Sequence, residues 1–279
     1  MEMLEFYALN ILVGVILAVT LGLLGVHLVI RQKSLETLMI GQTMQLGIIV
    51  GAFISSLLWH ETKLIHEGHI GLGISLGLAG FIYFLHGKLS KKWYQLKTEL
   101  ALIAIILSIA LTHVLTALNP LIESHFVRSF VGDIVTASQG ENYFLIIVGL
   151  LGLIYFLNFK QKLFEDSLDL GLYGDLTHKR AYGFEFVLFL TMGVSIHVFG
   201  LMFTLGCLLI PTILMGLSKS INYKSLILNI LLGNSLAVLG GFLLNIQFEN
   251  LPTSPSIVIF LSLIFSVRLI FARLGNRVS

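Results

Sequence analysis

The chain has 279 residues, of which 56% are hydrophobic and only 11% are charged, and its formal net charge is +2. Soluble domains carry about 25% charged residues, so this chain cannot cover its surface in water and must be an integral membrane protein. The single cysteine, Cys207, excludes an intramolecular disulfide framework, and we interpret it as a small packing residue.

Nine apolar stretches predict membrane-spanning helices, since one crossing needs about 20 residues. The predicted fold is all-α, a polytopic bundle of eight or nine spans that forms a single transmembrane domain over residues 1–279. Eight spans is the alternative because the short pair 184–199 and 200–217 also fits one crossing with a re-entrant piece. The predicted spans are 6–30, 38–58, 69–87, 99–119, 143–159, 184–199, 200–217, 225–246 and 254–272.

The basic residues alternate with the predicted spans. If the loop after the first span is cytoplasmic, all of the 17 lysines and arginines except Lys63 and Arg128 lie on the cytoplasmic side. The positive-inside rule therefore predicts an outside N-terminus and a cytoplasmic C-terminus.

Two glutamines interrupt the second predicted span. Gln42 and Gln45 lie three residues apart, so on a helix they project from nearly the same face. A buried amide without a partner is costly in hydrocarbon. The pair therefore predicts either interhelical hydrogen bonds or a polar lining for a transport path.

The first outward loop, residues 60–69, contains His60, His66 and His69. Imidazole is a good ligand for zinc and other divalent ions, so these residues are metal candidates. A solvated polar hairpin is the simpler interpretation. Within the spans, His113 and His197 are functional candidates because ionisable groups are expensive there; a neutral imidazole bonded to a backbone carbonyl is the simpler alternative for each.

Two further polar segments are predicted outside the membrane core. The outward segment 123–142 is too polar to span and too apolar for a free loop, so we expect it to lie partly inserted beside the bundle. Its Asp133 is either an outer-mouth ligand or a helix cap. The cytoplasmic segment 159–184 predicts either a solvated loop or a docking element with a short helix near Asp175. Glu185, at its edge, is expected to meet a partner or water.

Four motifs, in order along nearly the whole chain, resemble the permease subunit of bacterial zinc and manganese ABC uptake transporters. Ser254 stands where that family usually has glycine, and Lys179 stands where it has alanine. The motifs are FVGDIVTAS (130–138), DLTHKRAYG (175–183), GCLLIPTILMGLSKS (206–220) and LPTSPSIVIF (251–260).

The resemblance implies a permease of the bacterial cytoplasmic (inner) membrane that moves a divalent metal as its substrate. It implies a homo- or heterodimer, cytoplasmic ATPase subunits that use the ATP, and an extracytoplasmic metal-binding protein. Asp175, Lys179, Arg180 and Gly183 would then form the ATPase-docking segment. The chain itself has no nucleotide-binding fingerprint, so we expect no bound cofactor and no enzymatic activity.

The family's usual metal ligands, an aspartate and a histidine on the second helix, fall on Leu38 and Gln42. Three explanations stay open. A second, different permease chain could keep the ligands, the cargo could differ from a bare transition-metal ion, or the glutamines could be structural. Gln42, Gln45 and Asp133 are the substrate-path candidates. The chief rival function is a secondary transporter driven by an ion gradient, for which internal repeats would be expected.

Overall fold

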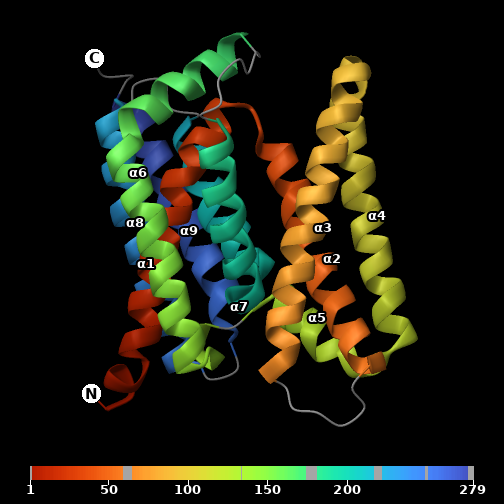
Figure 1. Ribbon diagram of the computed structural model, residues 1–279. Helices are drawn as coiled ribbons and strands as arrows, with labels where there is room; N and C mark the ends of the chain where they lie inside the picture. Colours follow the sequence, from red (N-terminus) through yellow and green to blue (C-terminus); the bar gives the residue numbers. More distant parts are fainter. Residues whose placement is uncertain are drawn as a thin grey trace.

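A computed structural model describes residues 2–58, 65–132, 134–173, 181–216, 222–248 and 251–275. In these ranges all regular structure is helical, as expected, and eight helices are long and apolar enough to cross a membrane (Figure 1). The α-helices are α1 (Glu2–Ile30), α2 (Ser34–Leu58), α3 (Ile65–Lys92), α4 (Lys97–Leu118), α5 (Glu123–Phe130), α6 (Gln139–Tyr173), α7 (Ala181–Gly216), α8 (Tyr223–Gln247) and α9 (Thr253–Gly275). Three short 3-10 helices are η1 (Tyr94–Leu96), η2 (Pro120–Ile122) and η3 (Ile134–Thr136).

Helix α7 folds back on itself at Gly200, whose φ of 84° and ψ of 163° are not helical. The hydroxyl oxygens of Ser195 and Thr204 are 2.8 Å apart, whereas nine residues of continuous helix would rise by about 13 Å. At one level of α1, His27 meets Phe184 of the first arm and Gly25 faces Leu208 of the second. The predicted pair 184–199 and 200–217 is therefore two antiparallel arms, which favours nine crossing segments over eight.

The helices form two groups, with α7 packed against members of both. Helices α2, α3 and α4 stand together beside α5, and α1, α6, α8 and α9 stand on the other side of α7 (Figure 1). Most of α1, α2 and α7 is buried, while α3, α4 and α9 expose large apolar side chains. Such an exposed apolar belt is what a lipid environment requires.

Small residues bring α2 and α3 unusually close. A Cβ atom on Gly51 would lie 2.5 Å from the Cα of Gly71, and one on Gly47 would clash with the backbone of Ser75. Packing of this kind holds helices together in lipid, where van der Waals contact does much of the work. Gly73 and Gly77 face open space instead, so only some of the glycines of α3 lie in this contact.

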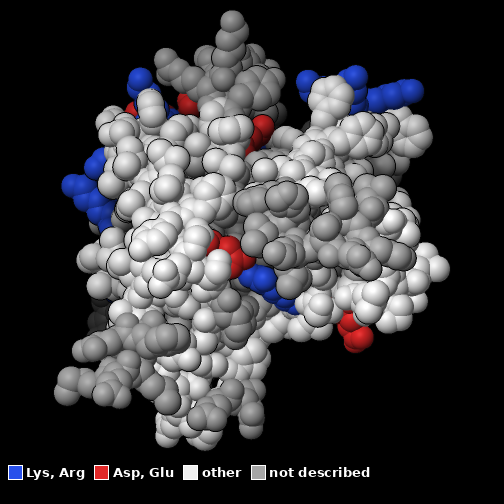
Figure 2. All heavy atoms as spheres, turned by 60° about the horizontal axis from the view of Figure 1, so that its bottom comes forward, with Lys and Arg blue, Asp and Glu red and all other residues white. Residues whose placement is uncertain are grey.

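Charged side chains gather at one end of the bundle, which we call the basic end. It carries Arg31, Lys33, Lys97, Lys224 and Arg268, among others. The opposite end carries α5 and is called the α5 end. Figure 2 is turned so that the α5 end comes forward: its surface is mostly uncharged, with one basic and one acidic patch near the middle, and the other lysines and arginines lie toward the rim. This asymmetry matches the alternation of basic residues along the sequence.

Candidate functional site: the α2–α7 seam and its two ends

The two helix groups meet where α2 packs on both arms of α7, a contact that we call the α2–α7 seam. Gly41 of α2 lies against Leu201 and Leu205 of the second arm. One turn further along, Met44 lies against Gly193 of the first arm. Any movement of α7 relative to α2 must open or slide this seam.

One of the two predicted glutamines, Gln45, lies on the face of α2 that meets the seam. Gln45 follows Gly41 by four residues and so shares its helix face. Gln45 is 2% exposed and its Nε2 has no hydrogen-bond partner, while Gln42 is partly buried. If Gln45 joined two helices through a hydrogen bond, its amide hydrogen would need an acceptor on the other helix. The structure instead leaves a buried donor of Gln45 free, and a free buried polar group calls for an explanation such as a water or a ligand.

The turn of α7 is held at the α5 end by backbone contacts. A Cβ atom on Gly200 would lie 2.6 Å from the amide nitrogen of Gly132, so the two glycine backbones cross directly. The Ser254 hydroxyl donates to the carbonyl oxygen of Phe199, next to the break, at 3.1 Å. Ser254 is the residue that departs from the glycine of the related permeases, and here it has a structural function.

Two asparagines fix the segment that follows Gly132. Asn10 of α1 donates to the carbonyls of Ile134 and Val135 at 2.9 and 3.1 Å, and Asn142 of α6 donates to Asn10 Oδ1 at 2.7 Å. Asp133 itself lies outside the described residues, so its assignment as ligand or cap stays a prediction. Of its neighbours, Gly132 meets the turn of α7 and Ile134 is held by Asn10 of α1.

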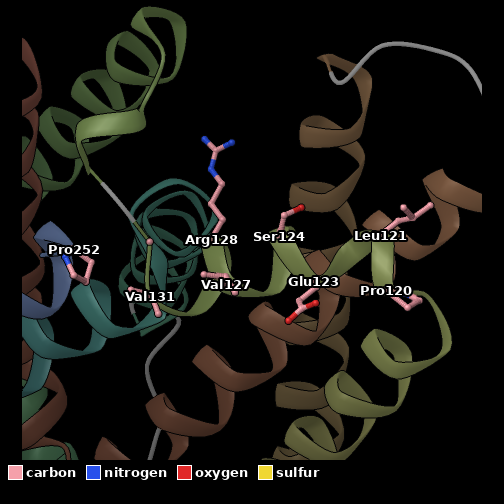
Figure 3. A pocket seen from close by; sticks show the side chains of 9 residues that line it. Pro120, Leu121, Glu123, Ser124, Val127, Arg128, Val131 and Pro252 are labelled. Atoms are coloured by element: carbon pink, nitrogen blue, oxygen red, sulfur yellow. The ribbon is translucent and has the colours of Figure 1, made fainter. Parts of the chain in front are cut away.

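A hollow of about 700 Å³ opens at the α5 end (Figure 3). Figure 3 shows α5 running along it, with Pro252 at one end and Pro120 at the other. Glu123 and Arg128 supply its charges, and Val127 and Leu121 are exposed apolar side chains on its lining. Segment 123–142 thus begins with the short helix α5, which lines an open hollow, and its partial insertion into the membrane stays a prediction.

A network of buried charges closes the seam at the basic end. Lys33 Nζ lies 2.9 Å from Glu185 Oε1 of α7 and donates to Tyr83 Oη of α3 at 3.0 Å. Tyr83 in turn donates to the same carboxylate oxygen at 2.7 Å. Glu36 lies 3.9 Å from Lys33 and 2.6 Å from Lys97 of α4. These five residues join α7 to all three helices of the α2–α4 group.

Arg31 is buried beside this network with few partners. Its Nε donates to Ser167 of α6 at 3.0 Å, and its guanidinium carbon lies 4.3 Å from the centre of the Phe184 ring. Both terminal nitrogens have no hydrogen-bond partner. Burial lowers the pKa of Arg31, opposed by the charges of Glu185 and Asp166. The arginine therefore couples α6 to the start of α7 mainly through Ser167 and the aromatic ring.

The remaining predicted site residues lie at the edges of the described chain. His60, Asp175, Lys179 and Arg180 are outside it, and the helix α3 includes His66 and His69 without a description of their side chains. Gly183 is exposed in the first turn of α7. Within the described ranges, no group of three or more His, Cys, Asp or Glu residues could hold a metal ion. The outer histidine site and the docking segment stay predictions.

Two residues have surroundings that the sequence did not specify. Glu185, expected to meet a partner or water, is paired inside the bundle with Lys33 of the same chain, 152 positions away. His113 is exposed on the surface of α4, where it packs against Phe126. The expectation missed Tyr83 and Ser167 as well. The available signal was a charged residue, Glu185, at the start of a long apolar run, which demands a buried partner.

The family model described as the ABC 3 transport family matches residues 3–272 of the chain. No curated protein matches. Among solved structures, the chain is similar to one described as PsaBC from Streptococcus pneumoniae in complex with Fab, with a TM-score of 0.74 and 16% sequence identity. That similarity covers 95% of this chain and 92% of the other, so the two share a fold over their whole lengths.

Proposed function

Because the chain belongs to the ABC 3 transport family, we propose that it carries a divalent cation along the α2–α7 seam and takes mechanical work from a separate ATPase. Membership confirms the resemblance found in the sequence: the chain is a multi-pass permease subunit of an ABC importer of the zinc and manganese class, in the bacterial inner membrane. A gradient-driven secondary transporter is not favoured.

The basic end faces the cytoplasm in this proposal. The positive-inside rule assigns lysines and arginines to that side, and they gather there with few exceptions. The α5 end then faces outward, and its hollow of about 700 Å³ is the surface offered to an extracytoplasmic metal-binding protein. A second permease chain completes the transporter, and residues 1–279 serve as one permease domain.

The observation that carries the mechanism is the course of α7. Its first arm begins at Ala181, directly after residues 174–180, and enters the ion-pair network within its second turn at Glu185. The arm then passes Gly193 at the seam and reverses at Gly200, where it meets the α5–η3 segment. Movement of residues 174–180 by an ATPase would therefore be transmitted through α7 alone to both the seam and the turn at Gly200. Asp175, Lys179, Arg180 and Gly183 form the docking segment in this proposal.

The chemistry of the path follows from its polar groups. With Leu38 and Gln42 in the usual ligand positions, the middle of α2 offers amide oxygens instead of a carboxylate and an imidazole. Oxygen ligands suit manganese better than zinc, which prefers nitrogen and sulfur. We therefore propose manganese-like cations as the cargo, with Gln42, Gln45 and Asp133 as contacts along the path and His60, His66 and His69 as outer metal contacts.

The test is to purify the chain from membranes together with the subunits that bind it and to measure its bound metals by elemental analysis. The proposal expects an ATPase in the complex and manganese in excess of zinc. Recovery of the chain without an ATPase would contradict the docking proposal, and zinc in excess would contradict the assignment of the cargo.

A further inference from the structure

We propose that Lys33 is a tethered cation that locks the cytoplasmic end of the α2–α7 seam, and that Lys33 must leave Glu185 and Tyr83 before the transported ion can pass. We call the three residues the latch. The inference rests on the proposed function, because a lock has a purpose only if the seam is the path. The inference gives a function to Lys33, Tyr83 and Glu185, which lie outside the motifs that resemble the family.

The geometry of the latch is that of a cation held by oxygens. The ammonium group of Lys33 lies within 3.0 Å of two oxygen atoms, the Glu185 carboxylate and the Tyr83 hydroxyl, and a second carboxylate, Glu36, is 3.9 Å away. These oxygens come from α7, α3 and α2 in turn. The side chains of Lys33 and Glu185 are only 12% and 17% exposed, so water screens their attraction little.

The latch lies at the end of the seam, where it blocks the route to the cytoplasm. Ile40 and Leu188 line the same small cavity, which has room for about 10 Å³. That volume holds about one water molecule. A divalent ion with even part of its hydration shell cannot cross there. The α5 end carries the larger hollow of about 700 Å³, so in this proposal the cytoplasmic end of the seam is the more tightly closed of the two ends.

Two features make the latch suited to opening rather than to permanent packing. A buried ion pair adds little net stability compared with an apolar pair, yet it is costly to break on one side alone, which suits a two-state element. The three residues also join moving parts: Glu185 belongs to α7 close to residues 174–180, whereas Lys33 and Tyr83 belong to the α2–α4 side. Lys97 stays with Glu36 within that side when Lys33 leaves.

The test measures how fast a thiol behind the latch reacts. Ile40→Cys places a thiol in the small cavity, 3% exposed in the closed state, and the native Cys207 is fully buried. The permease, in complex with its ATPase and without ATP, is treated from the cytoplasmic side with a charged, water-soluble thiol reagent. The chain without Ile40→Cys gives the background reaction.

Adding Lys33→Met should raise the labelling rate of Ile40→Cys by roughly tenfold, the factor that corresponds to about 1.4 kcal/mol. Tyr83→Phe keeps the ring packed on Phe189 and should raise the rate less, so it tests the latch even if Lys33→Met does not fold. The exchanged pair Lys33→Glu with Glu185→Lys should restore slow labelling. Lys88→Met removes an exposed lysine of α3 that lies outside the ion-pair network and should leave the rate unchanged.

Equal labelling rates in the Lys33→Met, Tyr83→Phe and unchanged-latch chains would overturn the latch. Failure of the exchanged pair to slow labelling would overturn the pairing of Lys33 with Glu185. Uptake by the chain with an unmodified latch is measured in parallel. If that chain transports metal with ATP but the latch variants label alike, the proposed function stands and the latch falls; if it transports nothing, the proposed function itself falls.

Discussion

The informative side chains of this protein are polar groups that a lipid-embedded bundle should avoid. Each buried charge or amide either meets a partner from another helix, as Glu185 meets Lys33, or lacks one, as Gln45 Nε2 does. The first kind holds elements together. The second kind leaves a hydrogen-bond donor inside the molecule, which a buried water molecule could accept from, whereas a cation would be held by the amide oxygen.

Replacing Gln42 by alanine should reduce metal uptake by roughly tenfold, because one polar contact of the path is lost, equivalent to about 1–1.5 kcal/mol. The amount of folded protein in the membrane should not change, since Gln42 is only partly buried. Uptake of radioactive manganese into cells, normalised to the permease in the membrane, measures both. Unchanged uptake would assign Gln42 to packing.

The Gln45→Leu variant distinguishes a function in the transport path from a function in packing more clearly than Gln42→Ala does. The Nε2 atom of Gln45 has no partner to lose, and removal of an unsatisfied buried polar group is neutral or stabilising by about 1 kcal/mol. The melting temperature of the detergent-solubilised variant should therefore stay level or rise while uptake falls. A lower melting temperature would show that the amide contributes to folding instead.

At the scale of elements, the sequence predicts where helices run but not which charged residues pair. The apolar stretches placed nearly every span, and the separation of 184–199 from 200–217 anticipated the two arms of α7. Hydropathy reports how strongly each stretch of the chain prefers lipid or water. It carries no information on which distant residues contact one another. Glu185 therefore looked like a residue at an edge, because Lys33 and Tyr83 lie 152 and 102 positions away.

The same limit applies to the small residues. Glycines recur along α2 and α3 in the sequence, but their spacing does not tell that Gly47 and Gly51 face a helix while Gly73 and Gly77 face open space. Only the rotation of α3 about its axis decides this, and it depends on tertiary packing. For the path, Gln42 and Gln45 were visible in the sequence, whereas Tyr83 and Ser167 carried no local signal.

Gly200→Ala should destabilise the turn of α7. Alanine would have to adopt a φ of 84°, which costs on the order of 1–3 kcal/mol, and its Cβ would press on the Gly132 backbone. We expect a lower melting temperature and less folded protein. Gly216→Ala is the matched control near the end of the same helix, because a Cβ there meets nothing within 4 Å. Equal melting temperatures for the two variants would contradict a strained turn at Gly200.

Reversing the charges of Lys179 and Arg180 to glutamate should weaken the association with the ATPase, because a docking segment relies on charge complementarity. The fraction of ATPase that co-purifies with the permease measures this, and it should fall by severalfold. Lys88→Glu is the control at the same end of the bundle. Normal recovery of the complex by the double variant would remove the docking assignment from residues 174–180.

At the scale of the whole molecule, two helix groups meet along one seam, with a hollow at the α5 end and buried ion pairs at the basic end. The element that contacts both groups, α7, also begins beside the segment assigned to the ATPase. In the proposed mechanism the seam is the transport path, the latch closes it and α7 transmits movement from the ATPase, while the chain has no nucleotide-binding motif. Transport by this permease should therefore depend on a partner that hydrolyses ATP.

The most direct test places the purified permease in vesicles that contain a fluorescent indicator for manganese, with or without its ATPase and ATP. The account predicts uptake only when the permease, the ATPase and ATP are all present, and loss of uptake when any one is omitted. Full-rate uptake by the permease alone, without nucleotide, would contradict it.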